Sequence, residues 1–141
     1  MSYERLGYLL DAGETVDASA SANTLTSTLT RASYVDHVLV QYTSTSTVGN
    51  RTVAIEILDG ADAVVATHFV DLIQIASLFR TYIVGYNAPS EAAFVSGQAQ
   101  RPIQIYRIPA GWKIRARDTA GIDSSDSIRM VISLRPVYTG L

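Results

Sequence analysis

Apolar and polar residues alternate along much of this chain, and the alternation is most regular in four segments. Residues 38–43, 53–57, 112–117 and 128–135 each place an apolar side chain at every second position. A repeat of two residues is the pattern of a β-strand with one face toward a core and the other toward solvent. The sequence therefore predicts strands in these four segments.

Turn-forming residues mark the ends of several predicted strands. Asp59-Gly60 separates the strand at 53–57 from a returning apolar stretch at 63–69, and both residue types tolerate the positive φ of tight turns. We expect a β-hairpin there. A further strand at 103–108 is followed by Pro109-Ala110-Gly111, which predicts another turn.

Three segments follow less regular patterns. Residues 71–84 combine a helix-like apolar spacing with a strand-like end, so we expect a short helical turn that leads into a strand at 79–84. Residues 85–102 contain two prolines and two glycines and are expected to form a long connection. Residues 11–33 are rich in Ser, Thr and Ala, which favours either a mobile arm or an edge strand.

The number and spacing of these strands predict an all-β fold, an antiparallel β-sandwich of jelly-roll type with about eight strands. Composition agrees, because Val, Ile and Thr make up more than a quarter of the 141 residues and Lys113 is the only lysine. The length suits one domain. We expect an N-terminal arm or edge segment at 1–33 and the sandwich at 34–141.

Charge and cysteine content narrow the functional classes. The formal net charge is −2 and the pI is about 5.6, so no overall field favours nucleic acid. There is no cysteine, and no apolar run approaches the roughly 20 residues that span a bilayer. The opening MSYERLGYLL lacks the long apolar stretch of a signal peptide. We expect a soluble protein made in the cytoplasm, with no membrane partner.

Five cations lie close together near the C-terminus. We expect the strands at 112–117 and 128–135 to pair as an antiparallel hairpin and to place these cations on one solvent face. Two interpretations remain open, a partner-binding face and a solvated face neutralised by Asp118 and by acids on neighbouring strands. The cations are Lys113, Arg115, Arg117, Arg129 and Arg135. The long connection at 85–102 is the second candidate contact region, through Tyr86 and Phe94.

Residues that could carry out catalysis or hold a metal are sparse. His37 and His68 are the only histidines, and two ligands without a third rarely hold a catalytic metal. Asp118, Asp123 and Asp126 lie in one loop and could bind Ca²⁺, but their spacing fits turn capping better. No nucleophile elbow or phosphate-binding glycine loop is present. We expect neither an enzyme nor a cofactor.

Three stretches of the chain resemble the jelly-roll cement (decoration) proteins of tailed bacteriophage capsids. They are the Ser/Thr/Ala-rich opening, the hairpin RTVAIEILDGADAVVATHF and the ending IPAGWKIRARDTAGIDSSDSIRMVISLRP. The resemblance implies a structural virion protein that binds the outside of the assembled capsid and cements neighbouring subunits. Its partner would be the major capsid protein, and the protein would form a homodimer or homotrimer.

A second hypothesis is a carbohydrate- or receptor-binding module of a phage tail or fibre. This function would need exposed aromatic side chains gathered in a groove. Several tyrosines could supply such a platform, although strand tyrosines more often pack in the core or at its rim. They are Tyr34, Tyr42, Tyr82, Tyr86 and Tyr106.

Overall fold

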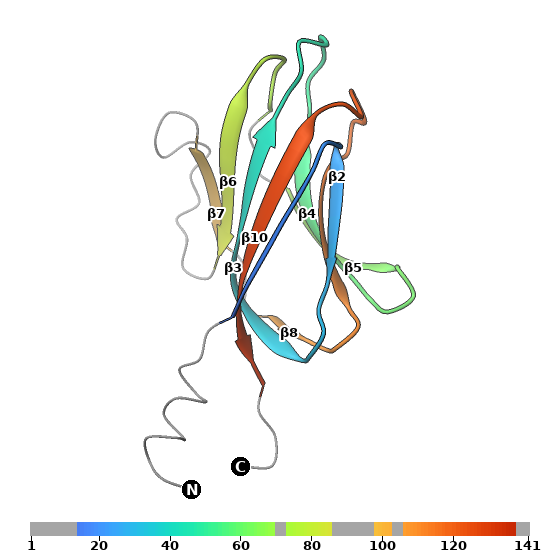
Figure 1. Cartoon of the computed structure of the whole chain (residues 1–141), viewed down its shortest axis with the longest axis vertical. Helices are drawn as coiled ribbons and strands as arrows, with labels where there is room; N and C mark the ends of the chain where they lie inside the picture. Colours follow the sequence, from blue (N-terminus) through green and yellow to red (C-terminus); the bar gives the residue numbers. More distant parts are fainter. Residues whose placement is uncertain (1–13, 70–72, 86–97, 103–105, 138–141) are drawn as a thin grey trace, which may run out of the picture.

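The computed structural model describes residues 14–69, 73–85, 98–102 and 106–137, and every regular element in them is a β-strand (Figure 1). None of these residues belongs to a helix that could cross a membrane. The strands are β1 (Glu14–Ala20), β2 (Thr24–Thr28), β3 (Ser33–Thr43), β4 (Val53–Leu58), β5 (Val64–Phe69), β6 (Phe79–Gly85), β7 (Gln98–Pro102), β8 (Tyr106–Ile108), β9 (Lys113–Asp118) and β10 (Ser127–Pro136).

The strands form two sheets packed face to face. Sheet A has the order β1-β10-β3-β6-β7, with β8 also paired to β3, and sheet B has the order β2-β9-β4-β5. All neighbours are antiparallel except β6 and β7. The chain crosses repeatedly from one sheet to the other, and eight strands wind as a jelly roll to which β7 and β8 are added. The predicted all-β jelly-roll sandwich is confirmed.

The core lies between the inner faces of the two sheets. Along β9 and β10 every second residue is buried, as the sequence alternation predicts. Val40, Tyr42 and Met130 from sheet A pack there with Ile55 and Ile114 from sheet B, all at most 2% exposed. Burial of each such side chain contributes about 1.5–3 kcal/mol, and the sandwich depends on these contacts because the chain has no disulfide.

The hairpin of β4 and β5 confirms the prediction from Asp59-Gly60, with one difference in the turn. Positive φ occurs at Asp62 (66°), whereas Gly60 does not need it. The Asp59 carboxylate accepts hydrogen bonds from the backbone N–H groups of Ala61 (2.8 Å) and Ala63 (3.0 Å). The turn is thus a five-residue loop closed by a side chain.

The predicted hairpin between residues 112–117 and 128–135 is wrong. β9 belongs to sheet B and pairs with β2 and β4, whereas β10 belongs to sheet A and pairs with β1 and β3. The loop between them crosses the sandwich. Alternation shows which face of each strand is buried, but both strands can satisfy it from opposite sides of one core.

Two smaller predictions also need correction. The expected helical turn before β6 is absent from residues 73–78, where Gln74 forms an isolated β-bridge with Arg51 and a turn follows at Ala76 and Ser77. The end of the expected connection at 85–102 is the strand β7, which pairs with β6. At the N-terminus, β1 and β2 are outermost strands of sheets A and B.

Candidate functional site

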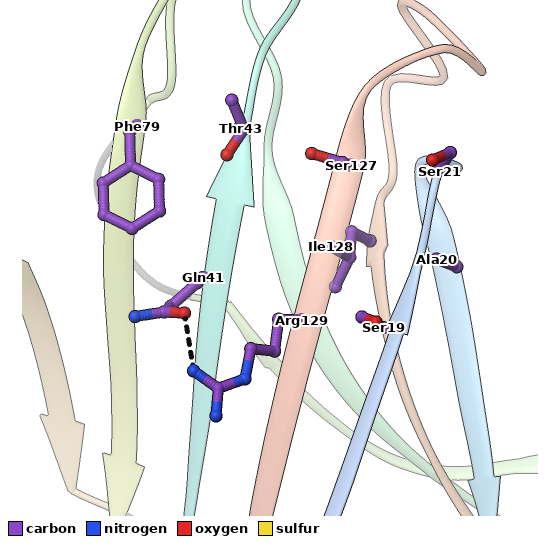
Figure 2. A pocket seen from close by; sticks show the side chains of 9 residues that line it. All are labelled: Ser19, Ala20, Ser21, Gln41, Thr43, Phe79, Ser127, Ile128 and Arg129. Atoms are coloured by element: carbon purple, nitrogen blue, oxygen red, sulfur yellow. Dashed lines mark hydrogen bonds between the residues drawn. The ribbon is translucent and has the colours of Figure 1, made fainter.

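A shallow, open groove of about 430 Å³ lies on the outer face of sheet A (Figure 2). Strand pairing brings its residues together from distant parts of the sequence. Ser19, Arg129 and Gln41 are consecutive partners across β1, β10 and β3, and side chains of directly paired residues project from the same face. The lining residues are Ser19, Ala20, Ser21, Gln41, Thr43, Phe79, Ser127, Ile128 and Arg129.

The polar centre of the groove is Arg129. Its guanidinium donates to both carboxylate oxygens of Asp17, at 3.1 and 2.8 Å, and also to Gln41 Oε1 at 3.2 Å. The hydrogen bonds from Arg129 hold the pKa of Asp17 below its ordinary value, so the carboxylate stays charged. Gln41 thus uses its side-chain oxygen as an acceptor for Arg129, and its amide nitrogen is a donor group.

An aromatic ring forms the opposite wall. Phe79, the first residue of β6, is paired with Thr43 and its side chain is 54% exposed. Thr43 is in turn paired with Ser127, so two hydroxyl groups lie between the ring and the end of β1 (Figure 2). The groove therefore combines hydroxyl groups, an amide and a guanidinium with one apolar ring. None of its described lining residues is Asp, Glu or His.

The five predicted cations do not share a face. Those on β9 belong to sheet B and those on β10 to sheet A, so the predicted common surface is wrong. Arg115 and Arg117 both pair with Glu56 on β4, at 3.0 and 2.6 Å, and Lys113 pairs with Asp62. On β10, Arg129 pairs with Asp17 as above.

The other predicted contact residues are Arg135, which the structure describes, and Tyr86 and Phe94, which it does not. Arg135 pairs with Asp36 at 2.8 Å and lies with its guanidinium carbon 5.7 Å from the centre of the Tyr34 ring. Thus each of the five cations has an acidic partner on a neighbouring strand or turn. Tyr86 lies outside the described residues, as does Phe94.

The three aspartates considered as a calcium site lie at the end of β9 (Asp118) and in the β9–β10 loop (Asp123 and Asp126), and they act as hydrogen-bond acceptors. Asp118, 3% exposed, accepts from the backbone N–H groups of Thr52, Ala120 and Ile122. Hydrogen bonds from hydroxyl groups of the β3–β4 loop lower the pKa of Asp123 to about 2. Within the described part of the chain no three residues of metal-binding type are gathered for a metal ion.

The histidines and tyrosines are also dispersed. His37 lies on β3 in sheet A, 3.0 Å from Ser133 Oγ, and His68 lies on β5 in sheet B. Tyr42 and Tyr82 are fully buried, so they provide no platform for a sugar. Tyr34 is 37% exposed, and the side chains of the other two proposed tyrosines are outside the described set.

No pattern in the sequence indicated the groove. Apart from Arg129, its polar lining residues are Ser, Thr and Gln, which are common on any solvent face. They become a site only through the pairing of β1, β10, β3 and β6. Arg129 was singled out for its charge, whereas its position between Asp17 and Gln41 follows from the sheet order.

No protein-family model matches this chain, and no curated protein matches it. Among solved structures it is similar to a carbohydrate-binding module from a glycoside hydrolase family 9 enzyme of Ruminococcus flavefaciens, at 13% identity and a TM-score of 0.44, over 86% of this chain and 97% of that chain. It is also similar to the catalytic domain of a GH87 α-1,3-glucanase in complex with nigerose, at 15% identity and a TM-score of 0.38, over 90% of this chain. The chain spans only 22% of that glucanase. Likenesses this distant concern the fold and do not bear on what the chain binds.

Proposed function

We propose that this chain is a non-catalytic binding module whose ligand is a carbohydrate held in the groove on sheet A. The observation that carries the proposal is the combination of hydroxyl, amide and guanidinium groups around an exposed Phe79 ring. A sugar presents hydroxyl groups at its edges and C–H groups on its faces. It can therefore hydrogen-bond to Gln41 and Arg129 while one face packs on the ring.

The charge of the groove favours a neutral sugar. Arg129 is the cation in the groove, and its charge is balanced by Asp17 at 2.8 Å. The guanidinium of Arg129, the amide of Gln41 and the hydroxyl groups of Thr43 and Ser127 together offer both donors and acceptors, which suits the vicinal hydroxyl groups of an uncharged glycan. An acidic sugar would gain less, because the carboxylate of Asp17 already occupies the guanidinium.

A glycan array probed with the full chain tests this function. We expect binding to a set of neutral glycans, and a loss of about tenfold in affinity for either Gln41→Ala or Phe79→Ala, the effect of one lost contact of about 1.4 kcal/mol. Val65→Ala is the matched control, because Val65 is 50% exposed on β5 of sheet B. An array without any bound glycan, or equal losses for Val65→Ala, would refute the proposal.

A second candidate is the capsid cement protein that the sequence resemblance implies, located on the virion exterior and bound to the major capsid protein. It is favoured by exposed aliphatic side chains at the end of the sandwich where β3 ends and β6 begins. Val48 is 90% exposed there, and Ile73 and Ile75 are 53% and 57% exposed. Co-purification with intact particles in a fixed ratio to the capsid subunit supports this function. Recovery only as free protein contradicts it.

A further inference from the structure

A network of buried polar side chains lies behind the groove, between the two sheets. At its centre is Arg51, a loop residue that is completely buried. Its Nε and Nη2 donate to the two carboxylate oxygens of Asp126, at 2.9 and 3.1 Å, and Nη1 donates to the carbonyl oxygens of Thr47 and Gly49. Asp126, also 0% exposed, accepts further hydrogen bonds from Tyr42 Oη at 2.6 Å and from a backbone N–H at 2.8 Å.

Gln74 extends this network to the third loop. Its backbone N–H and C=O pair with those of Arg51, at 3.0 and 2.8 Å. Its side-chain nitrogen lies 3.0 Å from Tyr42 O and 2.9 Å from Leu78 O, and its side-chain oxygen accepts from Tyr82 Oη at 2.9 Å. Arg51, Asp126, Gln74, Tyr42 and Tyr82, which we call the buried network, thus connect the β3–β4, β5–β6 and β9–β10 loops.

Stability alone does not account for a buried ion pair at this position. Transfer of two charges out of water is costly, and apolar residues of similar volume often stabilise a protein at least as well as a buried ion pair. What a saturated polar network adds is one defined geometry, because each donor has to meet its acceptor.

Three residues that line the groove directly follow residues of the network or a residue bonded to it. Thr43 directly follows Tyr42, Ser127 directly follows Asp126, and Phe79 directly follows Leu78, whose carbonyl oxygen accepts from Gln74. Thr43, Phe79 and Ser127, here named the groove rim, are paired with one another across β10, β3 and β6. Their side chains project outward from sheet A, while the network lies on its inner side.

We infer that the Arg51–Asp126 pair, together with Gln74, positions the groove rim for its ligand. The inference rests on the proposed function for its ligand, a neutral glycan, and on the hydrogen bonds above for its mechanism. A rim fixed before binding loses little conformational freedom when the ligand arrives, which raises affinity without any new contact. Arg51 and Asp126 are positioning residues, because neither lines the groove.

Amide hydrogen exchange and glycan binding test the inference together. In Arg51→Met we expect exchange at residues 43, 79 and 127 to speed up by about tenfold relative to amides of β4 and β9, because the local opening free energy falls. Binding to the array glycan that the unmodified protein binds most strongly should weaken. Tyr42→Phe, which removes only the phenol hydrogen bond to Asp126, is a milder second variant with the same expected direction.

Glu56→Gln is the matched control. Glu56 is a buried acid with two arginine partners, but on sheet B, so its loss should speed exchange in β4 and β9 without speeding exchange at the rim. Unchanged relative exchange at the rim in both Arg51→Met and Tyr42→Phe would overturn the inference. Absence of any glycan binding would instead refute the proposed function, and the exchange result would still decide the positioning role.

Discussion

Breaking the buried ion pair is the perturbation whose cost the structure defines most clearly. Arg51→Met leaves the Asp126 carboxylate without its guanidinium while the carboxylate stays completely buried. Asp126→Leu leaves the guanidinium with only carbonyl and hydroxyl partners. The double variant removes both charges. The three proteins together form a double-mutant cycle for one contact.

The expected magnitudes follow from the burial of both groups. Removal of one partner of a buried pair costs about 3–5 kcal/mol, because the other charge remains without compensation. Domains of this size have unfolding free energies of about 5–15 kcal/mol, so either single variant loses a large share of its stability. The double variant should cost less than the sum of the two by about 2–3 kcal/mol, the coupling expected for residues in direct contact.

Urea unfolding followed by the fluorescence of Trp112 provides the assay. Trp112 is the only tryptophan and packs against the core, so its emission reports the global transition. A loss of about 4 kcal/mol should lower the urea midpoint by about 2 M. Arg135→Met breaks an exposed pair and serves as the control, with an expected cost of about 0–1 kcal/mol. Additive single costs, or an Arg51→Met cost no larger than the control's, would show that the two buried charges do not stabilise each other.

Three further predictions use other parts of the molecule. Burial raises the pKa of Glu56, but hydrogen bonds from two arginines more than offset this effect and lower the pKa from 4.5. The contribution of Glu56 to stability should therefore be complete above pH 4.5 and be lost as the pH falls through the lower folded-state pKa. A Glu56→Gln variant with the same acid denaturation profile as the unmodified protein would contradict this. Burial and the hydrogen bond to Asp126 raise the pKa of Tyr42. The difference between the ultraviolet titration curves of the unmodified protein and of Tyr42→Phe should therefore show no phenol ionisation near pH 10. A difference at that pH would count against the buried network. Gly49→Ala should cost about 1–3 kcal/mol in thermal unfolding, because φ is 149° and a Cβ would lie 2.8 Å from Ile122 Cγ2; an unchanged midpoint would show that the loop relaxes.

The sequence showed where the strands lie, but it did not show which strands pair with one another. Alternation located β3, β9 and β10 because each of these strands has one buried face, and it also located β4, although all six residues of β4 are buried. Asp59-Gly60 located the turn of one hairpin. Alternation could not assign β9 and β10 to different sheets, because an apolar inner face looks the same from either side of the core. The cationic surface predicted from residues 113–135 was wrong for this reason.

Neither the groove nor the buried network behind it could be predicted from the sequence, for related reasons. Gln41 and Ser19 are ordinary residues of a solvent face, and only the strand order places them on either side of Arg129. Arg51 lies in a polar loop, where an arginine is normally solvated. Its complete burial depends on Asp126, 75 residues away in the chain, and no local pattern connects the two.

The proposed function places a neutral glycan on the outer face of sheet A. It is tested most directly by nuclear magnetic resonance titration of the full chain with the oligosaccharide that binds best on the array, observing backbone and side-chain amides. We expect shifts at Ser19, Gln41, Phe79 and Arg129, with the Gln41 side-chain amide among the largest, and no shifts on β9. Shifts confined to sheet B, or no shift with any glycan tested, would contradict it.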